Sequence, residues 1–177
     1  YYLFNKPKGV ITTSSDDQGR ATVMDYFRKE KGRIYAVGRL DQNTEGLLIM
    51  TNDGELANIL MHPSRLVDKT YEVKVKGRIA DSVLQHLADG VELKDGMTAP
   101  ADVYYIGYDP KTNLTSVEIT IHEGRKRQVK RMLEAVGHPV LRLHRESFGP
   151  LELGSLPEGK YRVLSSQEVV ALEQAAR

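Results

Sequence analysis

The sequence predicts an α+β fold, and three patterns carry that prediction. Residues 70–76 alternate between apolar and polar side chains, which is the period of a half-exposed strand. Residues 101–108 and 114–121 flank the turn-rich segment 109–113, as two strands of an antiparallel pair do. Apolar residues recur at helical spacing over 129–136. Strand pairs separated by helices, with few long crossovers, favour an α+β domain over a doubly wound one.

The first predicted element is a β-hairpin. Residues 1–5 and 10–13 read as two short strands around Lys6-Pro7-Lys8-Gly9. Proline presets one backbone angle of such a turn, and glycine supplies the other. The polar residues 14–20 are then expected to form a loop.

Two capping residues indicate the next helices. Thr22 can begin a helix over 23–27, and Asp53 is placed to cap a second one over 54–61. Threonine and aspartate suit this position because their side-chain oxygens accept hydrogen bonds from the first free N–H groups of a helix.

Further helices and strands complete the chain. Asp81 can start a helix that Gly90 ends in a left-handed conformation. Strands are expected at 140–143 and 161–164, and Ser165 opens a capping box before a last helix. The predicted helices turn the following residues toward the core: Val83, Leu84, Leu87, Val129, Met132, Leu133, Val136, Val169, Val170 and Leu172.

Length and composition set modest limits. With 177 residues and 40% hydrophobic content, the chain can bury a core as one domain, residues 1–177, with two lobes that share a sheet as an alternative arrangement. Cysteine is absent, which excludes a disulfide scaffold, and no apolar run approaches a membrane span. We therefore expect a monomeric cytoplasmic protein. Because the chain begins at Tyr1 inside an apolar segment, we also expect it to be part of a longer protein.

Positive charge is concentrated in one segment although the net charge is only +1. Five of the seven residues from Arg125 to Arg131 are basic. Helical spacing turns Arg127, Lys130 and Arg131 away from the core, where they can meet the phosphates of a nucleic acid. The alternative is an ordinary solvated helix face.

One carboxylate, Asp41, lies between two apolar runs, 34–37 and 47–50, which we predict to be strands. A carboxylate where two core elements meet is costly unless it is paired or used. On its own, an Arg-Leu-Asp triplet more often only caps a turn. Catalysis and turn formation therefore both remain open from this segment alone.

Three segments together resemble the signature of pseudouridine synthases, most closely the RsuA/RluB branch, which isomerises uridines in ribosomal RNA. They are Gly38 to Gly54, Asp68 to Val73, and Glu123 to Met132. The resemblance implies a mixed, mainly antiparallel sheet with flanking helices, a central active-site cleft, and no cofactor or metal. Its details lean toward large-subunit RNA, with a small-subunit enzyme as the alternative. Family members commonly carry an N-terminal RNA-binding domain that this sequence does not contain.

The resemblance assigns catalytic roles to three residues. Asp41 matches the essential catalytic carboxylate, and Arg125 matches an arginine that approaches it. Such a cation would keep a partly buried carboxylate ionised. Tyr71 matches a tyrosine that packs beside the target uracil, although an inward tyrosine in a strand is ordinarily a core residue.

Three further residues match positions that meet RNA or the base. Val129 matches an aliphatic residue beneath the base, and Arg39 one that can fill the space left by the flipped nucleotide. Lys6 matches a residue expected to contact RNA or support the pocket.

Two other classes of function compete with this interpretation. A non-catalytic RNA-binding or ribosome-assembly module would need only the basic segment, so the set of Asp41, Tyr71 and Arg125 argues against it. A nucleoside hydrolase-like enzyme is disfavoured because the basic segment implies a polymeric substrate. The five histidines show no metal-binding spacing, and no nucleotide-binding fingerprint is present.

Overall fold

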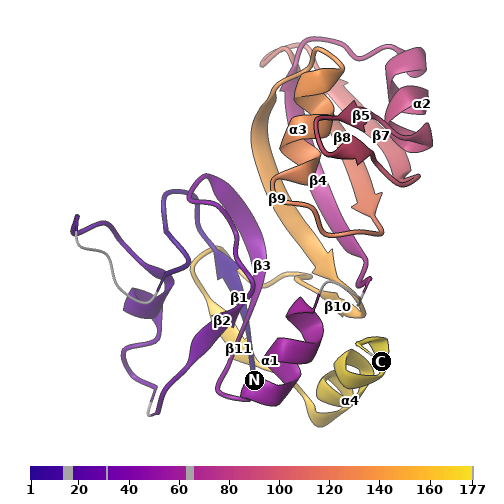
Figure 1. Ribbon diagram of the computed structural model, residues 1–177. Coiled ribbons are helices and arrows are strands. Elements are labelled where there is room, and N and C mark those ends of the chain that lie inside the picture. The colour runs from indigo at the N-terminus through magenta and orange to yellow at the C-terminus, as the bar shows by residue number, and fades with distance from the viewer. Residues whose placement is uncertain (14–17, 31, 63–65, 177) are drawn as a thin grey trace. The chain divides into compact units, whose positions relative to one another are not determined.

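The computed structural model describes residues 1–13, 18–30, 32–62 and 66–176. The chain divides into two compact units. Unit 1 comprises residues 1–67 and 145–177, and unit 2 comprises residues 68–144. Figure 1 labels their elements, and strand β9 (Val140–Phe148) contains the boundary between 144 and 145. That residues 1–177 act as one catalytic domain stays a prediction.

Unit 1 is built on a sheet centred on strand β1. This strand pairs antiparallel with β3 along one edge and with β11 along the other. Strand β2 also pairs antiparallel with β3, and β10 pairs with β9. The elements of the unit are β1 (Tyr2–Lys6), the 3-10 helix η1 (Val23–Tyr26), β2 (Tyr35–Val37), β3 (Thr44–Thr51), α1 (Gly54–Met61), β10 (Leu151–Glu152), β11 (Tyr161–Val163) and α4 (Ser166–Ala175).

The predicted hairpin at the start of the chain is wrong. Strand β1 pairs with β3 and β11, whereas residues 10–13 contribute only a parallel bridge between Ile11 and Thr22. Residues 10 and 11 are apolar because Val10 and Ile11 are buried in the core, although they do not form a strand. Part of the loop predicted over 14–20 lies outside the described residues.

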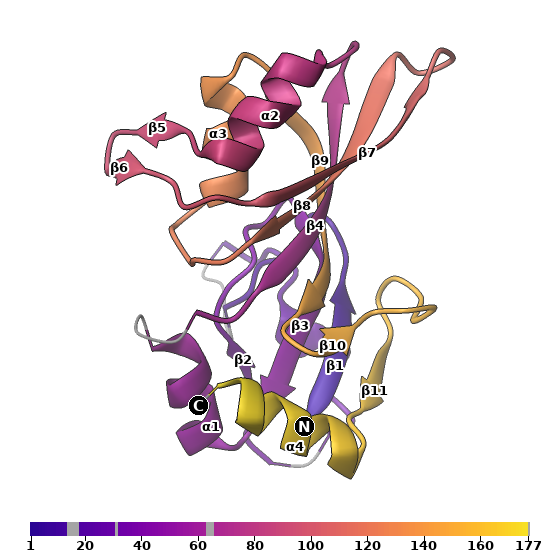
Figure 2. The same cartoon turned by 90° about the vertical axis from the view of Figure 1, so that its right-hand side faces the viewer.

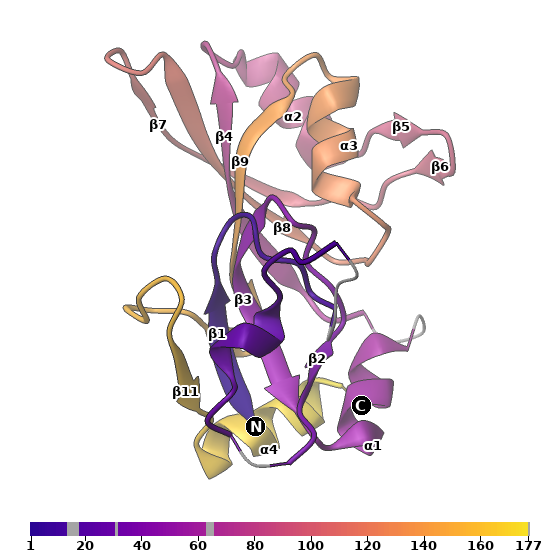
Figure 3. The ribbon, with the colours of Figure 1, turned by 90° about the vertical axis from the view of Figure 1, so that its left-hand side faces the viewer.

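Both faces of the unit 1 sheet are covered. Leu47 and Ile49 of β3 pack against helices α1 and α4, while Leu48 and Met50 face the opposite core, which contains Phe27. Figures 2 and 3 show α4 on one side of β1 and β3 and the segment that follows β1 on the other. The continuous apolar run of β3 therefore reflects burial on both faces.

Unit 2 is built on a sheet with helices on one face, and β9 is a neighbour of β4 in that sheet. Strand β8 lies between β4 and β7. Figures 2 and 3 place α2 and α3 on the same side of these strands. The elements are β4 (Lys69–Lys76), α2 (Asp81–Asp89), β5 (Glu92–Leu93), β6 (Gly96–Met97), β7 (Asp102–Asp109), β8 (Leu114–Ile121) and α3 (Gln128–Ala135).

Most helices and the β7–β8 pair confirm the sequence predictions. Helix α1 spans the predicted residues, and the core side of α3 is the one that helical spacing indicated. Gly90 ends α2 with φ 122° and ψ 144°, a positive φ but not the predicted left-handed helical conformation. In α4, Val170 is exposed although a core position was predicted. No helix in the described part of the chain is long and apolar enough to cross a membrane.

Gly46 allows two backbones of unit 1 to approach closely. Its φ is +110°, and a Cβ at this position would lie 2.3 Å from the carbonyl oxygen of Arg145 in β9. Only glycine tolerates both conditions, because a side chain would add backbone strain and collide with a main-chain atom that cannot rotate away. Gly38 also has a positive φ, of +75°, but no atom lies within 4 Å of its would-be Cβ.

We predict that Gly46→Ala lowers the free energy of unfolding by more than about 2 kcal/mol, whereas Gly38→Ala costs about 1 kcal/mol. The control carries the strain of a positive φ without the collision. Urea unfolding of the two variants beside the parent measures the difference. Equal losses would show that the approach to Arg145 does not limit this position.

Candidate active site

Asp41 lies on a turn that both neighbouring segments hold in place. Its carbonyl oxygen accepts a hydrogen bond from the Thr44 N–H at 2.9 Å, so the turn leads directly into β3. The Thr12 hydroxyl donates to the Leu40 carbonyl at 2.6 Å and accepts from the Leu40 N–H at 3.2 Å. Gly9 N–H donates to the Gln42 carbonyl at 2.8 Å. The residues on each side of half-buried Asp41 are therefore fixed, which limits where its carboxylate can point.

Lys6 is a fully buried lysine beneath the same turn. Its ammonium donates to the carbonyl oxygens of Pro7, at 3.0 Å, and Gln42, at 3.3 Å. A buried charge needs such partners, because leaving water costs several kcal/mol. Of the two roles expected for Lys6, support of the site fits this burial, whereas direct contact with RNA does not.

Arg39 presents an exposed side chain two residues before Asp41. The next residue, Leu40, is only 5% exposed and is held by Thr12. The backbone beneath Arg39 is thus anchored while its guanidinium faces solvent. Entry of this side chain into a bound nucleic acid stays a prediction.

Tyr71 and Val129 belong to the core side of unit 2. Tyr71 is partly buried on β4, on the same side as Val73, and packs against the unit's core. Val129, near the start of α3, is 3% exposed within that core. The inward orientation predicted for both is confirmed, whereas their contact with a uracil base stays a prediction.

Arg125 is held by four groups of unit 2. Its Nη1 donates to the Gly96 carbonyl at 3.0 Å, and its Nη2 donates to the Met97 carbonyl at 2.6 Å. Carboxylates lie on two further sides, that of Glu123 3.4 Å from Nε and that of Asp95 3.5 Å from Nη1. A guanidinium has five N–H donors, so these contacts fix Arg125 without exhausting it.

Arg131 is bound to the protein more completely than helical spacing suggested. Its two terminal nitrogens bind the Asp95 carboxylate at 2.8 and 3.2 Å, and its Nε donates to the Lys126 carbonyl at 2.9 Å. The Arg131 guanidinium lowers the pKa of Asp95, which in turn raises the pKa of Arg131. The phosphate contact predicted for Arg131 therefore competes with a bidentate ion pair.

Arg127 and Lys130 have side chains that reach solvent near the start of α3. Arg127 is exposed and precedes α3 with φ 52° and ψ 35°, a left-handed conformation that is uncommon outside glycine. It is therefore the N-cap of the helix and not, as spacing suggested, part of its outer face. Lys130 lies one turn further along and is partly exposed.

A histidine between two carboxylates lies just before this basic segment. His122 Nδ1 is 2.8 Å from Asp68, and its Nε2 is 3.0 Å from Asp102. Hydrogen bonding to Asp68, supported by Asp102, raises the pKa of His122 above its ordinary value of 6.5. The pair of contacts ties the end of β8 to the residues that precede β4 and begin β7.

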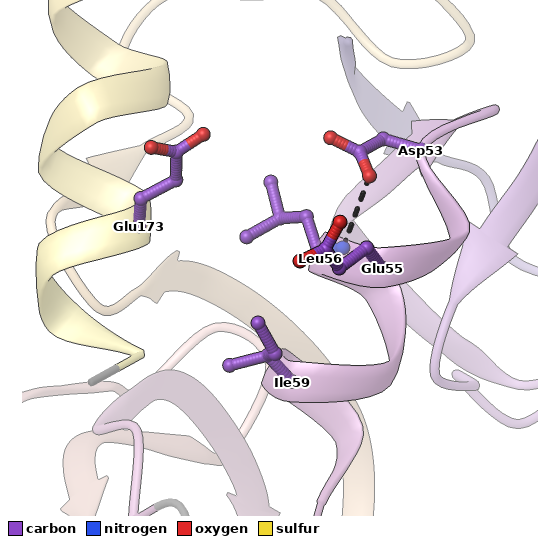
Figure 4. A pocket seen from close by; sticks show the side chains of 5 residues that line it. All are labelled: Asp53, Glu55, Leu56, Ile59 and Glu173. Carbon is purple, nitrogen blue, oxygen red and sulfur yellow. Dashed lines mark hydrogen bonds between the residues drawn. The ribbon is translucent and has the colours of Figure 1, made fainter.

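A pocket of about 180 Å³ lies elsewhere, between α1 and α4 of unit 1. Figure 4 shows that three carboxylates line it, those of Asp53, Glu55 and Glu173. None of the predicted site residues borders this pocket, and its negative charge disfavours a polyanion. Within the described residues, no cluster of three or more histidines and carboxylates is arranged to hold a metal ion.

The structure groups the predicted residues by unit. Lys6, Arg39 and Asp41 belong to unit 1, and the others belong to unit 2: Tyr71, Arg125, Arg127, Val129, Lys130 and Arg131. Asp41 and Arg125 belong to different units, and the ion pair between them stays a prediction. Sequence reasoning missed Thr12 and Asp95. Asp95 had a usable signal, because Lys-Asp-Gly is a turn sequence just after a predicted helix.

Known proteins share both sequence and fold with this chain. Residues 1–135 match the family described as RNA pseudouridylate synthase. The chain is 48% identical to ribosomal large subunit pseudouridine synthase B of Bacillus subtilis, over 99% of this chain and 72% of that protein. It is 46% identical to the synthase B of Yersinia pestis, over 91% of this chain and 51% of that protein.

Solved structures agree with these similarities. The match to a crystal structure of a pseudouridylate synthase covers 97% of this chain and 72% of the chain in that structure, with a TM-score of 0.82 and 31% identity. The match to a chain of an archaeal box H/ACA Nop10–Cbf5 complex covers 86% of this chain and 49% of that one, with a TM-score of 0.61 and 14% identity. The second likeness shows the fold alone. Together they confirm the predicted α+β class.

We predict that His122 makes the stability of unit 2 depend on pH. Because the folded-state pKa is raised, its stabilisation is complete below the unfolded pKa, near 6.5, and is lost as pH rises through the folded value. His122→Asn should therefore lose more stability, relative to the parent, in mildly acidic than in mildly alkaline buffer. Thermal unfolding across that range measures the effect.

The matched control is His86→Asn, which changes an exposed histidine on α2 of the same unit. The loss of stability in mildly acidic buffer, relative to mildly alkaline buffer, should be larger for His122→Asn than for this control. A parallel offset between His122→Asn and the parent at every pH would contradict the prediction.

Proposed function

The chain belongs to the RNA pseudouridylate synthase family, and we propose that it converts a uridine of large-subunit ribosomal RNA to pseudouridine through Asp41. The observation that carries the proposal is the likeness to the Bacillus synthase B, which extends over nearly the whole chain and so includes all three motif segments. The anchored turn around Asp41 supports the choice of catalytic residue.

The reaction needs few functional groups from the protein. The bond between ribose C1′ and uracil N1 breaks, the base turns, and a C1′–C5 bond forms. N1 gains a proton and C5 loses one, so nothing is oxidised and no water is consumed. One ionised carboxylate can serve as nucleophile or can stabilise an electron-poor sugar, as in glycosidases. Asp41 has the fixed backbone that such a group requires.

We assign Tyr71 and Arg125 to the same reaction. Tyr71 offers a ring beside which a uracil can pack, and a hydroxyl that can take part in moving the C5 proton. Arg125 supplies a positive charge that favours the ionised form of the catalytic carboxylate. What supports Arg125 is its fixed geometry, since all three of its nitrogens already have partners in unit 2.

RNA binding requires cations that can reach phosphate. Arg127 and Lys130 fit this role, because neither is buried and both lie at the start of α3. Arg39 is assigned to the space that the target nucleotide leaves when it is turned out, since chemistry on a stacked base requires its extrusion. We place Val129 beneath the extruded base.

The first test of this function removes the charge of Asp41. We expect Asp41→Asn to abolish release of tritium from ribosomal RNA labelled at uracil C5, because the amide keeps the shape of the carboxylate but not its charge. RNA affinity should stay within about twofold of the parent, a shift of less than about 0.5 kcal/mol. The control variant is Asp109→Asn, which changes an exposed carboxylate of unit 2.

Turnover by Asp41→Asn within tenfold of the parent, about 1.4 kcal/mol, would remove Asp41 from the catalytic role. Free uracil released in place of tritium by the parent protein would indicate hydrolysis, and binding without either product would indicate a non-catalytic module.

A second test measures which cations contact phosphate. The logarithm of the RNA association constant decreases linearly with the logarithm of the salt concentration. The magnitude of this slope decreases by about 0.7 to 0.9 for each lost phosphate contact. We expect Arg127→Gln and Lys130→Gln each to lower the slope by this amount while turnover at saturating RNA persists. Lys111→Gln, on the exposed β7–β8 turn, is the control. Unchanged slopes for both variants would show that neither Arg127 nor Lys130 contacts phosphate.

A further inference from the structure

The hairpin formed by β5 and β6 is anchored at its base. Thr98 follows β6, is 2% exposed, and pairs with Val91 through two bonds: its N–H donates to the Val91 carbonyl at 2.9 Å, and its hydroxyl accepts from the Val91 N–H at 2.8 Å. Gly90 fits against this base, because a Cβ there would lie 2.6 Å from the Thr98 carbonyl oxygen. The hairpin therefore starts from a fixed position at the end of α2.

The tip of the hairpin holds the basic segment. Asp95 binds Arg131 through both carboxylate oxygens and lies 3.5 Å from Arg125, while the carbonyls of Gly96 and Met97 accept from Arg125. Two arginines that are six residues apart in sequence thus meet one carboxylate. Bidentate pairs of this kind fix orientation as well as charge.

The other side of Arg125 is held by a second set of bonds. Glu123 accepts from the Ala99 N–H and from the Gln128 side chain, each at 2.9 Å, and Gln128 accepts from the Arg125 N–H at 3.2 Å. Gln128 is 3% exposed. Arg125 is therefore enclosed by the hairpin on one side and by a buried polar network on the other, and Asp95 is a hairpin residue that contacts both arginines.

We propose that Asp95 is a positioning residue of the catalytic reaction: it orients Arg125 for turnover and withholds Arg131 from RNA phosphate. The inference rests on the proposed function, since it specifies how the site of that function is set. Loss of the Asp95 charge then has two opposite consequences. Arg125 loses one of its orienting partners, which lowers turnover, and Arg131 becomes available to phosphate, which strengthens RNA binding.

This pair of effects separates positioning from a merely structural role. A hairpin needed only for folding would lower the amount of active protein, which reduces turnover and RNA binding together. Asp95→Asn keeps the volume of the side chain and removes its charge. We expect its kcat to fall at least about tenfold, and its RNA salt slope to become steeper by about 0.7 to 0.9 through one added phosphate contact.

A second variant assigns the two effects to the two arginines. In an Arg131→Gln background, Asp95→Asn should still lower kcat through Arg125 but should no longer change the salt slope. Glu92→Gln is the matched control, because it removes an exposed carboxylate of the same hairpin. It should leave both kcat and the slope as in the parent.

Three results would overturn the proposal: an unchanged kcat for Asp95→Asn, an unchanged or shallower slope, or equal effects from Glu92→Gln. Failure of the proposed function looks different, because the parent itself would then release no tritium. The salt slopes do not need turnover, so even in that case an unaltered slope for Asp95→Asn overturns the inference.

Discussion

The buried side chain of Lys6 is the constraint on which the placement of the turn that carries Asp41 depends. Strand β1 ends at Lys6, and the turn that carries Asp41 leads into β3, the neighbour of β1 in the sheet. The ammonium joins the two by binding carbonyls of Pro7 and Gln42. A displacement of the turn would break the bond between Lys6 and the Gln42 carbonyl, and a hydrogen bond made by a charged group contributes more than one between neutral groups.

In unit 2 the charged groups that hold one another lie at the surface, where five basic residues are close together in sequence. Five basic residues within seven would repel one another and would adopt many orientations if they faced only water. Asp95 and Glu123 reduce that repulsion and fix Arg125 and Arg131, while Arg127 stays exposed. The segment therefore contains two arginines that carboxylates orient and one, Arg127, whose side chain is exposed to solvent, a difference that a count of charges does not show.

Local patterns were predictable from sequence, and pairings between distant segments were not. The alternation of β4 and the buried side of α3 follow from spacing alone, and Asp53 caps α1 as its residue type indicates. The hairpin predicted over 1–13 failed because β1 finds its partners about 45 and 160 residues away, where no local rule applies. Strands β5 and β6 were missed because two residues each are too short for a period.

The same distinction governs the site. The motif segments identified Asp41, Tyr71 and Arg125 as candidates. The turn that carries Asp41 and the side chain of Arg125 are nevertheless held in part by residues outside those segments, Thr12 and Asp95. A hydroxyl that binds both backbone groups of Leu40 has no periodic signature. Residues that react are constrained by chemistry to a few types, whereas residues that position them need only a hydrogen bond in the right place. Sequence therefore indicates the chemistry of this protein more readily than the contacts that make the chemistry possible.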